Sequence, residues 1–226
     1  MLSPRLRLIA DKVKGKKVAD IGTDHAYIPI ELSEKNICEK IIATDIKKGP
    51  ADTAVRHINK KGIYNIEVRV GNGLTPIKPS EVDEIIIAGM GGKLISDILA
   101  ENREIAKSVR LILQPMNAQY ELRKFLLDNG YQISEEDLTV EGFKVYNLLI
   151  SEKTDKPYIY EEEIDYHLPK QLYKNEYFGK LLDKKIREFS KILEGNRKSK
   201  TGIDEESIGY YSEMLQKANE LKGGKL

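Results

Sequence analysis

A short apolar strand that ends in an acid-bearing glycine turn constrains this chain more than any other segment; it spans residues 18–27 and reads VADIGTDHAY. Dinucleotide-binding folds carry a bare glycine-rich turn at this place, because backbone amides and a helix N-terminus must approach a pyrophosphate. Asp20 and Asp24 would repel that anion. The turn therefore predicts a ligand that carries positive charge.

S-adenosylmethionine is such a ligand, since its ammonium, sulfonium and ribose diol can all be held by carboxylates through charge-assisted hydrogen bonds. Asp45 ends the next apolar run, 23 positions after Gly22. This is close to the ~20-residue spacing at which doubly wound folds place their ribose-binding acid. Together the two segments predict a methyltransferase.

Short aliphatic runs alternate with helical patterns up to residue 151, and this βαβα order predicts an α/β domain with a mostly parallel, Rossmann-like sheet. The expected strands cover residues 17–21, 41–45, 66–70, 84–88 and 110–113. The expected helices cover residues 3–13, 29–36, 50–61, 93–101 and 118–128. Two further segments, 131–140 and 143–151, have no helix between them and predict an antiparallel hairpin that closes the sheet edge.

The composition changes at residues 153–157, where the strand pattern ends. We therefore expect a methyltransferase domain at 1–153 and a helical domain at 154–226. Within the latter, apolar residues recur at spacings of three and four from Phe178 to Leu193 and from Ile208 to Leu221. This predicts an antiparallel helical hairpin, for which coiled-coil packing is one option.

The composition excludes several classes of protein. The net charge of +1 predicts no global attraction to polyanions, and the single cysteine excludes a disulfide framework. No apolar run is long enough to span a membrane, so we expect a cytoplasmic protein. The three histidines are scattered, which predicts no metal site, and no hydrolase or nucleotide-triphosphatase motif occurs.

Four motifs fall at the carboxyl ends of the expected strands, where open α/β sheets bind their ligands. Glycine, Asp and Asn also simply form turns, but four such motifs in register favour a cofactor site. We expect the first motif to hold the methionine part, the second the ribose, the third the adenine, and the fourth to line the methyl-acceptor pocket. The cofactor-binding candidates are Asp20, Gly22, Thr23, Asp24, His25, Asp45, Ile46, Gly71, Asn72, Gly73, Leu74, Gly89, Met90 and Gly91.

The segment after the fifth expected strand, Gln114 to Asn117, offers two amides that could read a base edge or cap the next helix. The fourth motif lacks the Asn/Asp-Pro-Pro-aromatic sequence of enzymes that methylate exocyclic amines, which argues against that kind of target.

The strings SPRL at 3–6, DIGTDHAYIP at 20–29, GNGL at 71–74, IAGMGG at 87–92 and LQPMN at 113–117 resemble the TrmK family of bacterial tRNA adenine-N1 methyltransferases, which act at position 22 of tRNA. The family often has an acid where this chain has Asn72. The resemblance implies a class I methyltransferase fold, S-adenosylmethionine as methyl donor and tRNA as substrate.

The implied chemistry needs alignment more than base catalysis, because the N1 lone pair of adenine is free at neutral pH. The methylated base becomes cationic, and Asp24 is the candidate to stabilise it. We expect His25, Tyr27 and Asn117 to contact an adenine flipped out of its stack, although turn formation or core packing would also explain these residues.

Positive charge concentrates in the tail, where residues 180–200 carry a net charge of +5. A solvated helix face would also explain such a run, but tRNA binding is favoured by the resemblance. The RNA-binding candidates are Arg5, Arg7, Lys180, Lys184, Lys185, Arg187 and Lys191, with Arg197, Lys198 and Lys200 completing the run. The expected protein is a monomer; the alternatives are a methyltransferase acting on another RNA or a small molecule, and a non-catalytic binding module.

Overall fold

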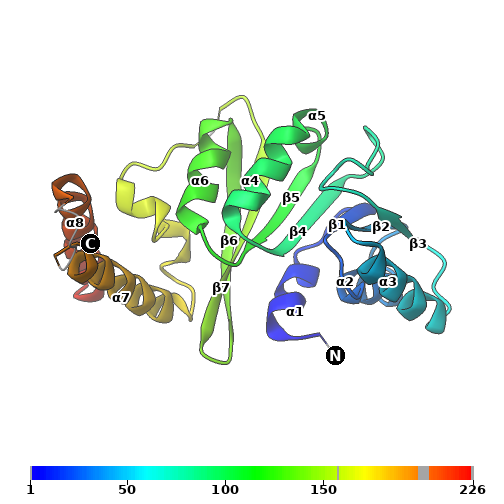
Figure 1. Ribbon diagram of the computed structural model, residues 1–226, viewed down its shortest axis with the longest axis horizontal. Helices are drawn as coiled ribbons and strands as arrows, with labels where there is room; N and C mark the ends of the chain where they lie inside the picture. Colours follow the sequence, from blue (N-terminus) through cyan, green and yellow to red (C-terminus); the bar gives the residue numbers. More distant parts are fainter. Residues whose placement is uncertain (1, 157, 198–203, 225–226) are drawn as a thin grey trace. The chain divides into compact units, whose positions relative to one another are not determined.

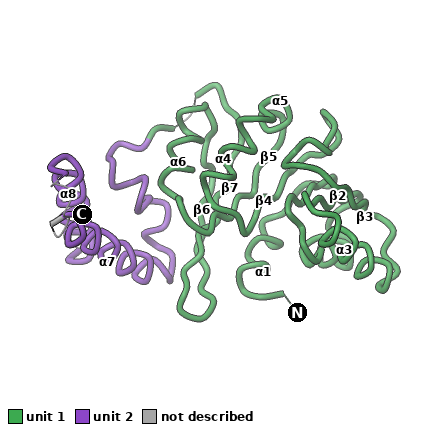
Figure 2. Tube along the Cα trace, viewed as in Figure 1, with its two compact units in different colours: residues 1–159 green, residues 160–226 purple. Residues whose placement is uncertain are grey.

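The computed structural model describes residues 2–156, 158–197 and 204–224 (Figure 1). Its contacts divide the chain into two compact units, residues 1–159 and residues 160–226 (Figure 2). This division falls a few residues after the one expected from composition. Three candidates of the basic run, Lys198, Lys200 and the Arg197 side chain, lie outside the described part of the structure.

The first unit is built on a seven-stranded sheet of order β3-β2-β1-β4-β5-β7-β6. The first five strands are parallel, which confirms the expected Rossmann-like arrangement. The strands are β1 (Lys17–Ile21), β2 (Lys40–Asp45), β3 (Ile66–Val70), β4 (Glu84–Met90), β5 (Arg110–Pro115), β6 (Tyr131–Glu141) and β7 (Lys144–Lys153).

Helices cover both faces of this sheet (Figure 1). The first three pack on one face, where residues of α1 and α2 share a core cluster with β1, β4 and β5. They are α1 (Pro4–Asp11), α2 (Tyr27–Glu34) and α3 (Lys48–Lys60). The other face carries α4 (Gly92–Glu101), α5 (Arg103–Ala106) and α6 (Gln119–Asp128). The short α5 was not expected from the sequence.

The core forms because the central strands are aliphatic on both faces, as strands covered by helices on both sides must be. Ile85, Ile86 and Ile87 in β4 are all fully buried. Arg123 of α6 is also fully buried, and its guanidinium donates to Glu136 Oε2 at 2.6 Å and to Asn147 Oδ1 at 2.9 Å. This buried ion pair joins α6 to the terminal hairpin.

The antiparallel hairpin of β6 and β7 closes the sheet edge, as expected. Its second strand lies inside, because β7 pairs antiparallel with β5, with Leu113 opposite Leu149, and β6 forms the sheet edge. Since β6 and β7 extend beyond the end of β5, the turn at Gly142 projects past the carboxyl ends of the parallel strands (Figure 1).

Cys38 lies after α2 and is buried. Burial, with a smaller effect from Glu84, raises the pKa of its thiol to about 11. Within the part of the chain that the structure describes, no helix is long and apolar enough to cross a membrane.

The second unit contains two short 3-10 helices, η1 (Glu163–Tyr166) and η2 (Lys170–Leu172), followed by α7 (Phe178–Arg197) and α8 (Glu205–Lys222). Asn196 near the end of α7 donates to Ser207 at the start of α8, at 2.8 Å. Lys222 at the end of α8 donates to Asp183 near the start of α7, at 2.6 Å. The two helices are therefore antiparallel, as their spacing patterns predict.

Candidate active site

The strand order reverses between β1 and β4, and this creates the crevice in which open α/β sheets bind ligands. The chain runs outward from β1 to β2 and β3, then returns to β4 on the other side of β1. Ile21 and Ile87 are partners in the register of β1 and β4. The turns that follow β1 and β4 therefore lie next to each other at the carboxyl edge of the sheet.

The turn after β1 has an unusual backbone. Gly22 has φ +75°, and Asp24 and Ala26 also have positive φ values of 48° and 56°. A left-handed conformation is unfavourable for alanine, so the surrounding structure must impose it. The backbone amides of Gly22 and Thr23 both donate to Thr44 O at the end of β2, at 2.9 and 2.8 Å. The turn is thereby tied to the neighbouring strand, and α2 begins at Tyr27, two residues earlier than expected.

A cavity of about 320 Å³ lies beside this turn. It is lined by six of the predicted site residues, together with Arg5, which was expected to bind RNA, and three apolar residues that were not singled out. The six are Asp20, Gly22, Thr23, Asp24, Tyr27 and Gly89, and the three are Leu6, Ile28 and Ala88.

Asp20 is the buried acid of this cavity, with 5% of its surface exposed. Its carboxylate accepts a hydrogen bond from Thr23 Oγ1 at 2.7 Å. Burial raises the pKa of Asp20 to about 6, and the Thr23 hydrogen bond opposes this increase only in part. A carboxylate that is desolvated to this degree is stabilised by a cationic partner.

Bare backbone at two glycines shapes the same cavity. A Cβ on Gly22 would lie 2.3 Å from Met90 Cε, so no side chain fits without displacing Met90. Gly89 has φ +77°, and a Cβ there would lie 3.6 Å from Arg5 Nη1. Two acids and exposed main chain suit the cationic, phosphate-free cofactor expected from the sequence.

The predicted ribose and adenine contacts lie at the same sheet edge but do not line this cavity. Asp45 is half-buried; its Oδ1 accepts from Lys47 N at 2.9 Å, and its carbonyl accepts from Gly71 N at 3.0 Å. This joins the ends of β2 and β3. Ile46 and Asn72 are exposed, so both can contact a ligand that extends over the edge.

Leu74 corrects one expectation. Its side chain is fully buried, so it cannot frame an adenine without moving. Gly73 beside it has φ +52°, and a Cβ there would lie 3.1 Å from Ile98 of α4. The absence of a side chain at Gly73 therefore lets this loop pack closely against α4.

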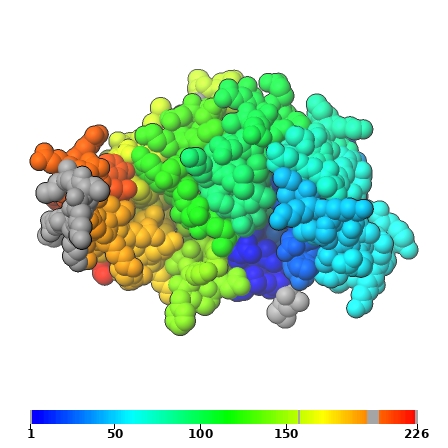
Figure 3. Space-filling view, viewed as in Figure 1, coloured from blue at the N-terminus to red at the C-terminus, as the bar shows by residue number. Residues whose placement is uncertain are grey.

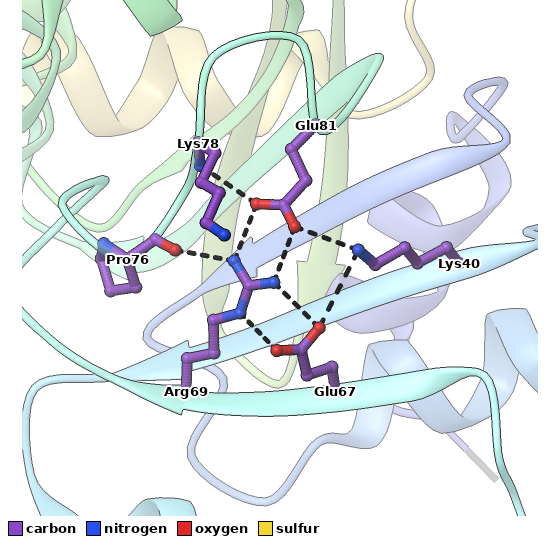
Figure 4. A network of polar contacts seen from close by, with 6 residues as sticks. All are labelled: Lys40, Glu67, Arg69, Pro76, Lys78 and Glu81. Carbon is purple, nitrogen blue, oxygen red and sulfur yellow. Dashed lines mark hydrogen bonds and ion pairs between the residues drawn. The ribbon is translucent and has the colours of Figure 1, made fainter.

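A network of charged side chains joins β3 to the loop that follows it (Figure 4). Arg69 donates to both oxygens of Glu81 at 2.7 Å and to Pro76 O at 2.7 Å. Glu67 and Lys40 complete the network. The Arg69 guanidinium holds the pKa of Glu81 well below its usual range. The loop that carries Asn72 is therefore fixed by charged contacts at its base.

The glycines after β4 also differ from the expected role. A Cβ on Gly91 would lie 2.8 Å from Asn117 Oδ1, and one on Gly92 would lie 2.3 Å from Ala118 O. Their missing side chains make room for the loop after β5, and Gly92 N donates to Asn117 O at 3.0 Å. Asn117 is exposed and does not line the cavity.

Arg5 points into the site rather than outward. Its Nη1 donates to Gln114 Oε1 at 2.8 Å, and the guanidinium carbon lies 5.7 Å from the centre of the Tyr146 ring. Gln114 Oε1 also accepts from Gly89 N at 3.3 Å. Figure 3 shows α1 at the surface between the β6–β7 hairpin and the α2–α3 region. Arg7, two residues further along α1, is ion-paired with Glu31 at 2.9 Å.

His25 belongs to an aromatic cluster that sequence spacing does not reveal. Its ring lies 5.3 Å from that of Tyr27 and stacks on His57 of α3 at 5.4 Å. Nδ1 of His25 is buried and has no hydrogen-bond partner among the described residues. Tyr27 is half exposed. Of the three rings, that of Tyr27 lines the cavity.

The basic residues of α7 fall on two faces of the helix. Lys180, Lys184, Arg187 and Lys191 follow spacings of four, three and four and lie on one partly or fully exposed face. Lys185 corrects an expectation, because it is buried and ion-paired with Glu188 at 2.9 Å. It is therefore not available to a phosphate.

No group of three or more His, Cys, Asp or Glu side chains within the described ranges could hold a metal ion.

A family model described as a methyltransferase domain matches residues 2–149, the segment that forms the sheet and the site described above. The first unit is thus a methyltransferase domain.

The relatives define the family more closely. The chain is 38% identical to the tRNA (adenine(22)-N(1))-methyltransferase of Bacillus subtilis over 163 residues, which are 71% of this chain and 68% of that protein. It therefore belongs to the TrmK family. The crystal structure of the B. subtilis M1A22 tRNA methyltransferase TrmK matches with a TM-score of 0.85 and 30% identity, over 97% of this chain and 98% of that chain.

Streptococcus pneumoniae Sp1610 in complex with S-adenosyl-L-methionine is also similar. It matches with a TM-score of 0.81 and 34% identity, over 95% of this chain and the whole of that chain.

Replacing Gly22 with alanine should weaken the binding of S-adenosyl-L-methionine about tenfold, because the new Cβ would displace Met90 and the left-handed backbone disfavours alanine. Isothermal titration calorimetry measures the change. Gly49→Ala is the matched control, since nothing lies within 4 Å of a Cβ at that position. Equal affinities in the two variants would contradict the close approach assigned to Gly22.

Proposed function

We propose that this protein transfers the methyl group of S-adenosyl-L-methionine to N1 of the adenine at position 22 of tRNA. The observation that carries the proposal is the buried Asp20 in a cavity at the β1–β4 reversal, in a chain of the TrmK family. The cofactor bound by Sp1610 and the reaction named for the B. subtilis relative support the donor and the target.

In this proposal the acids at the strand ends hold the cofactor. Asp20 and Asp24 face its cationic methionine part, and Asp45 accepts from the ribose hydroxyls. Asn72 offers an amide donor and acceptor to the adenine edge. The bound cofactor supplies an electrophilic methyl group, and the protein contributes its orientation.

The acceptor adenine would enter beside the turn after β1. Its N1 lies on the Watson-Crick edge, so the base must leave its stack before it reacts. Tyr27, half exposed and lining the cavity, offers a ring on which the base can stack. The Asp24 carboxylate, whose side chain is 66% exposed, would stabilise the positive charge that the adenine gains as the methyl group arrives.

We further propose that the protein acts as a monomer in the cytoplasm, where tRNA is available. Light scattering after size-exclusion chromatography, with and without tRNA, measures the molar mass and so tests whether the protein is a monomer.

Incubation of an unmodified tRNA transcript with enzyme and cofactor should yield one 1-methyladenosine per tRNA, detected by mass spectrometry of the digested nucleosides. A transcript with guanosine in place of the target adenine should remain unmethylated. Methylation of that control, or a different methylated nucleoside, would contradict the target. Cofactor binding without any methyl transfer would identify a non-catalytic module.

The pKa of Asp20 gives the cofactor affinity a defined pH dependence. Only the charged carboxylate attracts the ammonium group, so affinity should rise about tenfold between about pH 5 and about pH 7, as Asp20 ionises with its pKa of about 6. The same raised pKa implies that the free protein loses stability as pH rises from about 4 to about 6, because over this range the acid is ionised in the unfolded chain and still protonated in the folded one. Asp20→Asn should bind weakly and with little pH dependence, as calorimetry would show. If the cofactor affinity of this variant rose with pH as steeply as that of the wild type, Asp20 would be excluded as the titrating group.

Charge reversal on α7 should weaken tRNA binding. The double variant Arg187→Glu with Lys191→Glu should raise the KM for tRNA about tenfold at low salt, because fewer phosphates are neutralised, and should leave cofactor affinity unchanged. Arg103→Glu with Lys107→Glu changes the charge equally on two exposed residues at α5. Equal effects of the two double variants on KM would remove α7 from the RNA-binding surface.

A further inference from the structure

A second cavity, of about 420 Å³, shares Tyr27 with the cofactor cavity. Its other walls come from α2, from Leu2 and from the end of α3, where His57, Lys60 and Lys61 line it. We propose that this cavity binds the nucleotide adjacent to the target adenine in tRNA. The proposal rests on the proposed function, since it assigns a position to a neighbour of the methylated base.

The size and the aromatic lining of this cavity fit a single nucleotide. Ligand-binding pockets commonly measure about 300 to 1,000 Å³, so this cavity has room for a single nucleotide. The rings of Tyr27 and His57 lie 6.3 Å apart at 45°, and His25 stacks behind His57 at 23°. His57 Nδ1 lies 3.2 Å from His25 O, which fixes the orientation of its ring. Held aromatic rings are the surfaces on which unpaired bases stack.

The charged residues of the lining also fit a nucleotide. Both acids in the lining are already paired, Glu34 with Lys61, and Glu31 with Arg7 and Lys35. Among the described residues, Lys60 has no ion-pair partner and is exposed. Lysines in the last turn of a helix also offset its dipole, so charge alone would not assign a ligand. An unpaired ammonium beside two aromatic rings does fit a phosphate that follows a stacked base.

The cavity also lies where a neighbour of the target base would be. A base that rotates into the cofactor cavity must bring its own backbone to the entrance, which leaves its neighbours outside. Tyr27 forms part of the wall between the two cavities. A neighbouring nucleotide that occupies the second cavity would hold the strand on both sides of this wall, and the target adenine would be positioned by stacking as well as by its own contacts.

Steady-state methylation of unmodified tRNA tests the proposal with two pairs of variants. His57→Ala should raise the KM for tRNA about tenfold with kcat within about twofold of the wild type, whereas His57→Phe, which keeps a ring, should restore most of the loss. Lys60→Glu should raise KM by a similar factor. Lys17→Glu is its control, because Lys17 is an exposed lysine at the amino end of β1, whereas the site lies at the carboxyl end. Cofactor affinity should be unchanged in all four variants.

Cross-linking to tRNA that carries 4-thiouridine on either side of the target adenine adds a direct readout. The cross-linked peptide should contain residues 57–61. Unchanged KM values in His57→Ala and Lys60→Glu, or cross-links only to other peptides, would overturn the proposal while wild-type methylation persists. If His57→Ala loses cofactor binding, the KM of Lys60→Glu and the cross-linked peptide decide whether the proposal holds. Absence of 1-methyladenosine with the wild type would instead refute the proposed function.

Discussion

The candidate site depends on bare main chain at the point where β1 ends. The Gly22 amide donates a hydrogen bond to the carbonyl of Thr44. The Met90 side chain lies so close to Gly22 that a Cβ on this residue would be 2.3 Å from Met90 Cε. This contact brings the turns after β1 and β4 together, and it leaves Asp20 buried behind them. A side chain at this glycine would have to displace the Met90 methyl group, and it would strain the left-handed backbone of the turn.

The sequence predicts the sheet and the first motif well, because local chemistry determines both. Aliphatic runs such as Ile85 to Ile87 can only be buried between helices, and glycine with aspartate after a strand specifies a turn. Parallel strands end at one edge, so acids placed after successive strands must gather there. For the same reason Asp20, Asp24 and Tyr27 could be assigned to one cavity before any contact was known.

Other features depend on tertiary contacts that spacing does not encode. Arg5 lies on a helix whose pattern gives no sign that its guanidinium reaches Gln114, more than a hundred residues away. His57 joins His25 only because α3 packs beside the start of α2. Lys185 is different: it shares a four-residue spacing with Leu181 and Phe189, both buried, and this spacing could have placed it on the inner face of α7.

The single cysteine has a practical consequence for the protein in solution. With a pKa of about 11, the buried Cys38 thiol is almost entirely protonated at neutral pH. The thiolate is the form that reacts with oxidants, alkylating agents and other thiols. Cys38 should therefore resist air oxidation, and two folded copies should not become linked through sulfur. Stored without a reducing agent, the purified protein should keep a homogeneous covalent state.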